Sequence, residues 1–110
     1  MQKITKMAIL VIVDFSDNSY EAAVQAAELA ELLHQNLLIV HAINHYTRAY
    51  LSENNLDKEW IEESMESLSK GLTRGKEIDI DIVIREGSVY EVISSICKEN
   101  DILMAVFSLK

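Results

Sequence analysis

The stretch that decides the fold is MAILVIV, Met7 to Val13, which runs into the polar segment DFSDN, Asp14 to Asn18. An unbroken apolar run rich in isoleucine and valine indicates a strand buried on both faces, as strands are in a parallel sheet. The polar segment supplies turn and capping residues, and Asn18 with Glu21 three positions later predicts a helix N-cap. A buried strand that leads directly into a helix is typical of an α/β fold.

The rest of the chain continues the alternation of strands and helices. Further strands are predicted at residues 37–43, 78–84 and 102–109. Helices are predicted at residues 19–33, 56–74 and 88–99, the last opened by a capping box of Ser88 and Glu91. The polar residues 44–55 are predicted to form the longest loop. This order predicts a single domain over residues 1–110. Its fold is expected to be α/β, with an open parallel sheet of strand order 3-2-1-4 and helices on both faces.

The composition excludes several classes of protein. The 110 residues are 49% hydrophobic and 25% charged, which is typical of one globular domain with its own core. No apolar run approaches the ~20 residues of a membrane helix, so direct membrane insertion is not expected. The net charge of −8 argues against nucleic acid as a partner, because phosphate neutralisation dominates that binding. A single cysteine and the lack of a secretory signal favour a cytoplasmic location.

The polar residues after the first strand mark the expected site. In an open parallel sheet, ligands bind beyond the carboxyl ends of the strands, where the strand order reverses. That point lies between residues 14–16, after the first strand, and residues 107–109, at the end of the fourth. Asp14 is expected to point into this crevice, beside the positive N-terminus of the following helix. The local sequence alone favours a plainer role for Asp14 and Ser16, as turn and cap residues.

Segments spread along the whole chain are shared with a known family. They are ILVIVDFSDNS at 9–19, AAELA at 26–30, LIVHA at 38–42, VIREG at 83–87 with EVI at 91–93, and NDIL at 100–103. In this order and spacing they resemble the universal stress protein family. The resemblance implies an α/β sandwich around a parallel sheet and a non-catalytic, regulatory role in the stress response. Many members bind ATP or another adenine nucleotide, which is therefore the one cofactor that the resemblance implies.

The resemblance also assigns roles to particular residues. Asp14 matches the aspartate near the adenine and ribose, Ile12 stands at an adenine-side position, and Ala42 matches the apolar residue after the histidine of the second strand. The cofactor-binding residues expected on this basis are Ile12, Asp14, Phe15, Ser16, Ala42 and Val106. No catalytic or metal-ligating residue is expected.

The sequence departs from the family at the phosphate end of the site. ATP-binding members follow the fourth strand with G-x-x-G and later a glycine with serine or threonine, which hold the ribose and phosphates. Here Val106 and Leu109 stand in the first two places, and the sequence ends at Lys110. A valine side chain obstructs the close backbone approach that glycine allows. The resemblance thus implies a half-retained adenine pocket with weak or no ATP binding. The alternative is a fragment or domain of an ATP-binding member, or of a larger transporter or kinase.

Other functional classes and residues have weaker support. An enzyme on the same fold needs an activating group near the phosphates, and a receiver domain needs a phosphoacceptor aspartate where residues 84–86 stand. His41 and His45 are four residues apart at a strand end, which favours a structural His41 over a metal pair. Cys97, four residues after Ile93 in a predicted helix, is expected to be a buried structural thiol.

The fourth strand, residues 102–109, is predicted to lie at an edge of the sheet. Its interior, LMAVF at 103–107, carries no charge, proline or glycine, the devices that protect exposed edges from pairing. The opposite edge strand carries Asp79 and Asp81. In the family that the chain resembles, a fifth strand covers this position and often joins two subunits. We therefore expect a homodimer in which a second copy covers the Ile102–Leu109 edge.

Overall fold

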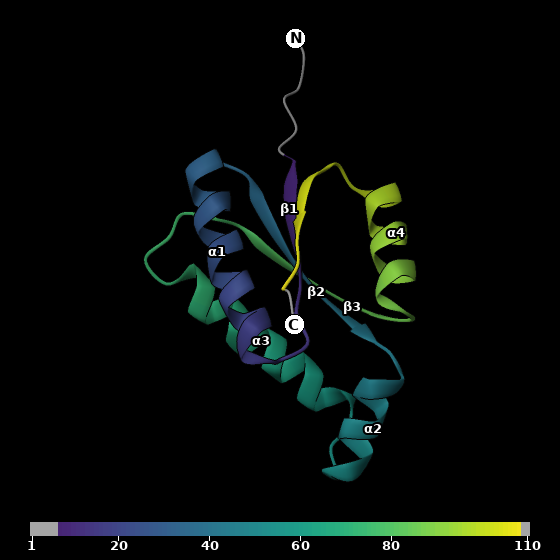
Figure 1. Ribbon diagram of the computed structural model, residues 1–110. Helices are drawn as coiled ribbons and strands as arrows, with labels where there is room; N and C mark the ends of the chain where they lie inside the picture. Colours follow the sequence, from purple (N-terminus) through teal and green to yellow (C-terminus); the bar gives the residue numbers. More distant parts are fainter. Residues whose placement is uncertain (1–6, 109–110) are drawn as a thin grey trace.

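The computed structural model describes residues 7–108, which form a four-stranded sheet with helices on both faces (Figure 1). The strands are β1 (Ala8–Ile12), β2 (Asn36–Ile43), β3 (Ile80–Glu86) and β4 (Ile102–Val106). The helices are α1 (Asp17–Leu33), α2 (His45–Glu53), α3 (Lys58–Thr73) and α4 (Val89–Glu99). Within residues 7–108, no helix is both long and apolar enough to cross a bilayer.

The strand order β3-β2-β1-β4, with every neighbouring pair parallel, confirms the predicted fold class. β1 lies inside the sheet, where Leu10 is beside Leu38 of β2 on one side and Ala105 of β4 on the other. β1 and β2 have strand partners on both sides and helices on both faces. They are therefore almost wholly buried, as their unbroken apolar runs predict.

Alternate residues of β1 contribute to two separate cores. Ile9 and Val11 pack in the core that lies under α1 and α3. Leu10 packs in the second core with Val92 and Ile96 of α4, because successive strand residues point to opposite faces. Figure 1 shows the same division, with α1 and α3 on one side of the sheet, α4 on the other, and α2 beyond its lower end.

α1 lies close to the sheet because its buried face is mostly alanine. The small side chains let the helix backbone approach the strands, and alanine is also the best helix former. The buried alanines are Ala22, Ala23, Ala26, Ala27 and Ala30. The predicted N-cap, Asn18, is wrong. Ser16 caps α1 instead, because its extended backbone lets its hydroxyl oxygen accept a hydrogen bond from the backbone N–H of Ser19 at 3.2 Å.

α2 replaces the loop that was predicted for residues 44–55. The side chain of Asn44 caps this helix by accepting hydrogen bonds from the backbone N–H groups of Tyr46 and Thr47, at 3.0 and 3.1 Å. Leu51 is its one buried residue, so the segment lacks the apolar periodicity by which a helix is recognised in a sequence.

The end of β4 also differs from its prediction. The strand stops at Val106, and Phe107 and Ser108 continue without regular structure. The last residue of the predicted strand, Leu109, lies outside the described residues.

In α4 the predicted capping box of Ser88 and Glu91 is present, with both reciprocal hydrogen bonds formed. The prediction of a buried Cys97 is wrong, because this side chain is exposed. Val92 and Ile96 occupy the buried face of α4. Since each helix residue is rotated by about 100° from the one before, the residue after Ile96 is turned away from the sheet.

Candidate functional site

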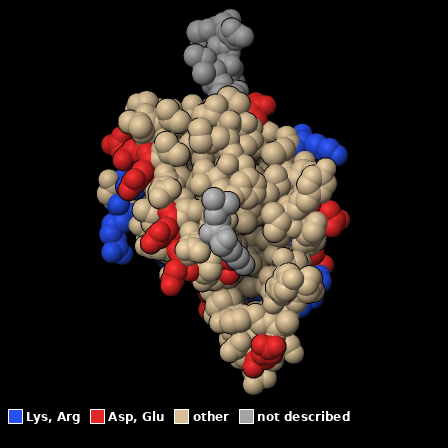
Figure 2. Space-filling model, in the orientation of Figure 1, with Lys and Arg blue, Asp and Glu red and all other residues tan. Residues whose placement is uncertain are grey.

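A cleft of about 850 Å³ opens at the carboxyl ends of the strands. The turn from β1 to α1 and the end of β2 line it at the sheet, and α2 and Trp60 of α3 line it from below. The lining is completed by Val89 at the start of α4 and by Phe107 and Ser108 after β4. In Figure 2 the surface is hollowed at this end of the sheet, above the narrower part that α2 forms. The cleft lies where the strand order predicts a ligand crevice, between the ends of β1 and β4.

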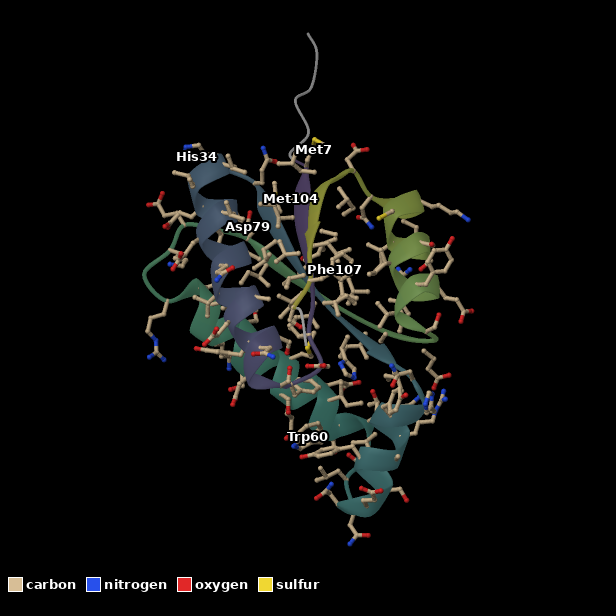
Figure 3. All side chains as sticks on the ribbon, viewed as in Figure 1. Met7, His34, Trp60, Asp79, Met104 and Phe107 are labelled. Carbon is tan, nitrogen blue, oxygen red and sulfur yellow. The ribbon has the colours of Figure 1, made fainter. Side chains whose placement is uncertain are left out.

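The residues expected at the site divide between the cleft and the core. Those that line the cleft are Ile12, Asp14, Phe15, Ser16 and Ala42. Val106 does not line it. This residue pairs with Val11 of β1 and packs in the core under α1 and α3. The next residue, Phe107, which Figure 3 labels near the end of β4, lines the cleft instead.

The turn between β1 and α1 is held by a set of short-range hydrogen bonds. Asp14 Oδ1 accepts from the backbone N–H of Ser16 at 3.0 Å, and the backbone N–H of Asp14 donates to Ser19 Oγ at 3.2 Å. The hydroxyl of Ser19, which is buried, donates to the carbonyl of Ser16 at 3.1 Å. Asp14 and Ser16 thus have the turn and cap roles that the local sequence favours, and both also line the cleft.

His41 is buried at the end of β2 and lines the cleft from the sheet side. Its Nδ1 donates to the carbonyl of Val13 at 2.8 Å, and its Nε2 lies 3.2 Å from Thr47 Oγ1. Burial lowers the pKa of His41, although the Val13 carbonyl and the Asp14 carboxylate act in the opposite direction. The ring is therefore neutral at pH 7, and its Nε2 accepts from the Thr47 hydroxyl. This geometry supports the structural interpretation of His41. Across residues 7–108, no group of three or more His, Cys, Asp or Glu is placed to hold a metal ion.

Aromatic rings from three elements form one wall of the cleft. The ring of Phe15 lies 4.9 Å from His41 and 5.1 Å from Trp60, centre to centre, and Tyr50 lies 5.4 Å from Trp60. We call Phe15, Trp60 and Tyr50 the aromatic wall. Figure 3 labels Trp60 where α3 meets α2. No pattern in the sequence predicted this wall. Tyr46 and Tyr50 are spaced four apart, as on one helix face, but their segment was predicted to be a loop.

The cleft has an acidic rather than a basic character. Among the described residues that line it, Asp14 is the one charged side chain, and none is lysine or arginine. The nearby cations of α2 and α3 are bound at the end of β3. Arg48 and Lys58 both pair with Glu86, with N–O distances of 3.6 and 2.9 Å. The hydrogen bond and charge of Lys58 lower the pKa of Glu86.

Comparison with known proteins identifies relatives of the whole described chain. Residues 7–107 match the sequence profile of the universal stress protein family. A search of curated protein sequences finds no match.

Solved structures of this family share the fold at low sequence identity. The universal stress protein UspA from Lactobacillus plantarum is 19% identical, with a TM-score of 0.75 over 96% of this chain and 78% of that one. A family member from Burkholderia pseudomallei is 22% identical, with a TM-score of 0.73 over 93% and 80% of the two chains. A universal stress protein in complex with cAMP is 17% identical, with a TM-score of 0.64 over 86% and 65%. At these identities the likeness shows the fold alone.

Proposed function

Because the chain belongs to the universal stress protein family, we propose that it is a non-catalytic regulatory module of the stress response that binds an adenine-containing ligand in the cleft. The observation that carries this proposal is the placement of Asp14, Ile12 and Ala42 together at the ends of β1 and β2. A solved structure of the same fold holds cAMP, which supports an adenine compound as the ligand class. The module is proposed to act in the cytoplasm.

Recognition of the base and ribose is assigned to the β1 end of the cleft. Asp14 Oδ1 already accepts the Ser16 N–H, and a carboxylate has further acceptor capacity for an exocyclic amine or a ribose hydroxyl. Ile12 and Ala42 offer apolar surface on the same side of the cleft. Such a site binds a planar ring through apolar contact and orients it through one charged acceptor.

ATP is expected to bind weakly. Val106 stands where the family pattern has its first glycine, and the described lining holds no lysine or arginine to pair with phosphates. Calorimetric titration with Mg-ATP at neutral pH tests this. A dissociation constant in the low micromolar range, about −8 kcal/mol, would contradict it.

The function itself is tested by replacing Asp14. The loss of a hydrogen bond to a charged group typically costs about 1.5–3 kcal/mol, so Asp14→Ala is expected to weaken the binding of any adenine compound by about tenfold or more. Asp81→Ala is the matched control, because Asp81 is an exposed aspartate of β3 that does not line the cleft. If the folded Asp14→Ala protein binds as tightly as the parent, the ligand binds elsewhere.

A second candidate function is a domain or fragment of a longer protein, either an ATP-binding family member or a transporter or kinase that carries this module. The chain spans 78% of the Lactobacillus plantarum protein and 80% of the Burkholderia pseudomallei one, so these relatives have additional sequence. A reading frame that continues beyond Lys110 with the further glycines of the phosphate pattern would favour this candidate.

The proposed partner is a second copy of the chain, and no nucleic acid partner is proposed for a protein of net charge −8. β4 pairs with β1 along one side, and its other side is an edge of the sheet. Leu103 and Met104 of β4 are exposed along this edge. In Figure 2 the face over β4 is largely free of charged side chains, while acidic side chains gather on the α1 side. Pairing through β4 would cover this apolar edge and give a homodimer.

A further inference from the structure

The cleft gathers several of the large apolar side chains that the protein exposes. Tyr46, Tyr50 and Phe107 are 73%, 48% and 51% exposed, and all three line the cleft together with the exposed Val89. Behind them the aromatic wall continues inward through Trp60 to Phe15. Apolar and aromatic side chains that stay exposed in a concave surface are typical of a ligand-binding site.

The electrostatics of the same cleft oppose an anion. Asp14 places a carboxylate in the lining, no lysine or arginine is found among the described lining residues, and the whole chain carries a net charge of −8. Arg48 of α2 and Lys58 at the start of α3 are both paired with Glu86. Phosphate groups placed in this cleft would therefore meet repulsion without a compensating cation.

The N-terminus of α1 offers an anion fewer N–H donors than an uncapped helix does. A helix N-terminus attracts anions through its unpaired N–H groups and its dipole. Here the side chains of the turn already occupy donors at that end, since Asp14 Oδ1 accepts the N–H of Ser16 and Ser16 Oγ accepts the N–H of Ser19. Asp17 adds a second negative charge in the first turn.

We propose that the cleft selects a planar nitrogen heterocycle without phosphate, neutral or cationic, so that a nucleoside such as adenosine binds in preference to its nucleotides. The ring lies against the aromatic wall, and its donor groups face Asp14. Asn44 uses its Oδ1 to cap α2, which leaves its amide N–H groups as donors at the cleft. The inference rests on the proposed adenine site and narrows its ligand class.

The experiment uses the single tryptophan of the chain, Trp60, as an internal reporter because it belongs to the aromatic wall. The full chain is titrated with adenosine, AMP and ATP, with excitation at the red edge of tryptophan absorption and calorimetry in parallel. We expect adenosine to bind at least about tenfold more tightly than ATP, with AMP between them. Raising the salt concentration is expected to improve ATP binding through screening and to leave adenosine binding unchanged.

Two variants separate the charge of Asp14 from the aromatic wall as causes of the preference for adenosine over ATP. Asp14→Asn keeps the side-chain shape but removes the charge, so the ratio of adenosine to ATP affinity is expected to fall by about threefold or more. Tyr50→Ala is expected to weaken every adenine ligand by about tenfold, because stacking of a base on an aromatic ring is lost. Tyr90→Ala is the matched control, since Tyr90 is an exposed tyrosine of α4 outside the cleft lining. Circular dichroism confirms that each variant is folded.

The possible outcomes separate this inference from the proposed function. If ATP binds as tightly as adenosine or more tightly, the inference is overturned and the adenine site stands. If no adenine compound changes the Trp60 emission or produces heat, both are overturned. If adenosine is preferred but Tyr50→Ala and Tyr90→Ala behave alike, the ligand does not lie against the aromatic wall, and the inference fails in that form.

Discussion

Phe15 is held in a backbone conformation that side chains rarely adopt, and this makes it a sensitive test of how the cleft is built. Its φ is +67°, in the left-handed region, where an L-residue is disfavoured by about 1–2 kcal/mol. The ring is retained there by contacts with His41 at 4.9 Å and Trp60 at 5.1 Å. An aromatic pair contributes about 0.5–1.5 kcal/mol beyond the area that it buries.

Two substitutions separate these effects. Phe15→Ala removes both ring contacts and keeps the backbone strain, so we expect a loss of about 2–3 kcal/mol, below the ~3–5 kcal/mol of a fully buried phenylalanine. Phe15→Gly removes the same contacts but relieves the strain, because glycine adopts positive φ freely. Glycine also loses more chain entropy on folding, which offsets part of that relief. The glycine variant is therefore expected to be more stable than the alanine variant by about 0.5–1 kcal/mol, the reverse of the order within helices and strands.

The assay is urea unfolding followed by circular dichroism at a fixed protein concentration, so that any dimerisation affects the three proteins alike. Circular dichroism is preferred to fluorescence because Phe15 touches the reporter, Trp60. An alanine variant more stable than the glycine variant would show that the turn relaxes out of the left-handed region. In that case the backbone at Phe15 would not be what fixes the position of the aromatic wall.

Three further predictions concern His41, the α2 cap and the β4 edge. Folding lowers the pKa of His41, so the neutral ring stabilises the folded protein. This contribution is complete above about pH 6.5, the ordinary pKa of histidine in an unfolded chain, and it is lost as the pH falls toward the folded pKa. The free energy of unfolding is thus expected to decline more steeply between pH 7.5 and 5.5 in the parent than in His41→Asn, and equal slopes would contradict this. Asn44→Ala removes the cap of α2 and is expected to destabilise this helix by about 1 kcal/mol. Amide hydrogen exchange is then expected to accelerate in α2 and not in α4, and equal acceleration in both helices would contradict this. Met104→Glu places a charge on the exposed β4 edge and is expected to convert the homodimer into a monomer. Light scattering at ~100 µM measures this, and a parent protein that is already monomeric would contradict the proposed homodimer.

Local sequence patterns predicted the parts of the fold that depend on neighbouring residues. The unbroken apolar runs around Leu10 and Leu38 predicted the two inner strands, because a parallel strand covered on both faces has no polar side. The Ser88 and Glu91 pair predicted the start of α4, since both partners of a capping box lie within one turn. The usual arrangement of open parallel sheets, in which the first strand lies centrally and the fourth lies on its other side, then predicted the strand order and the place of the cleft.

Only the tertiary structure decided which residues line the cleft. α2 has one buried residue, Leu51, so no apolar period marked it as a helix. Val106 turns into the core because its pairing with Val11 places it on the α1 face, and that register is not visible in either strand alone. Phe15 is distant along the chain from Tyr50 and Trp60, and it meets them because the turn after β1, α2 and the start of α3 lie at the same end of the sheet. Such contacts depend on packing between elements, so the sequence pattern within any one element does not predict them.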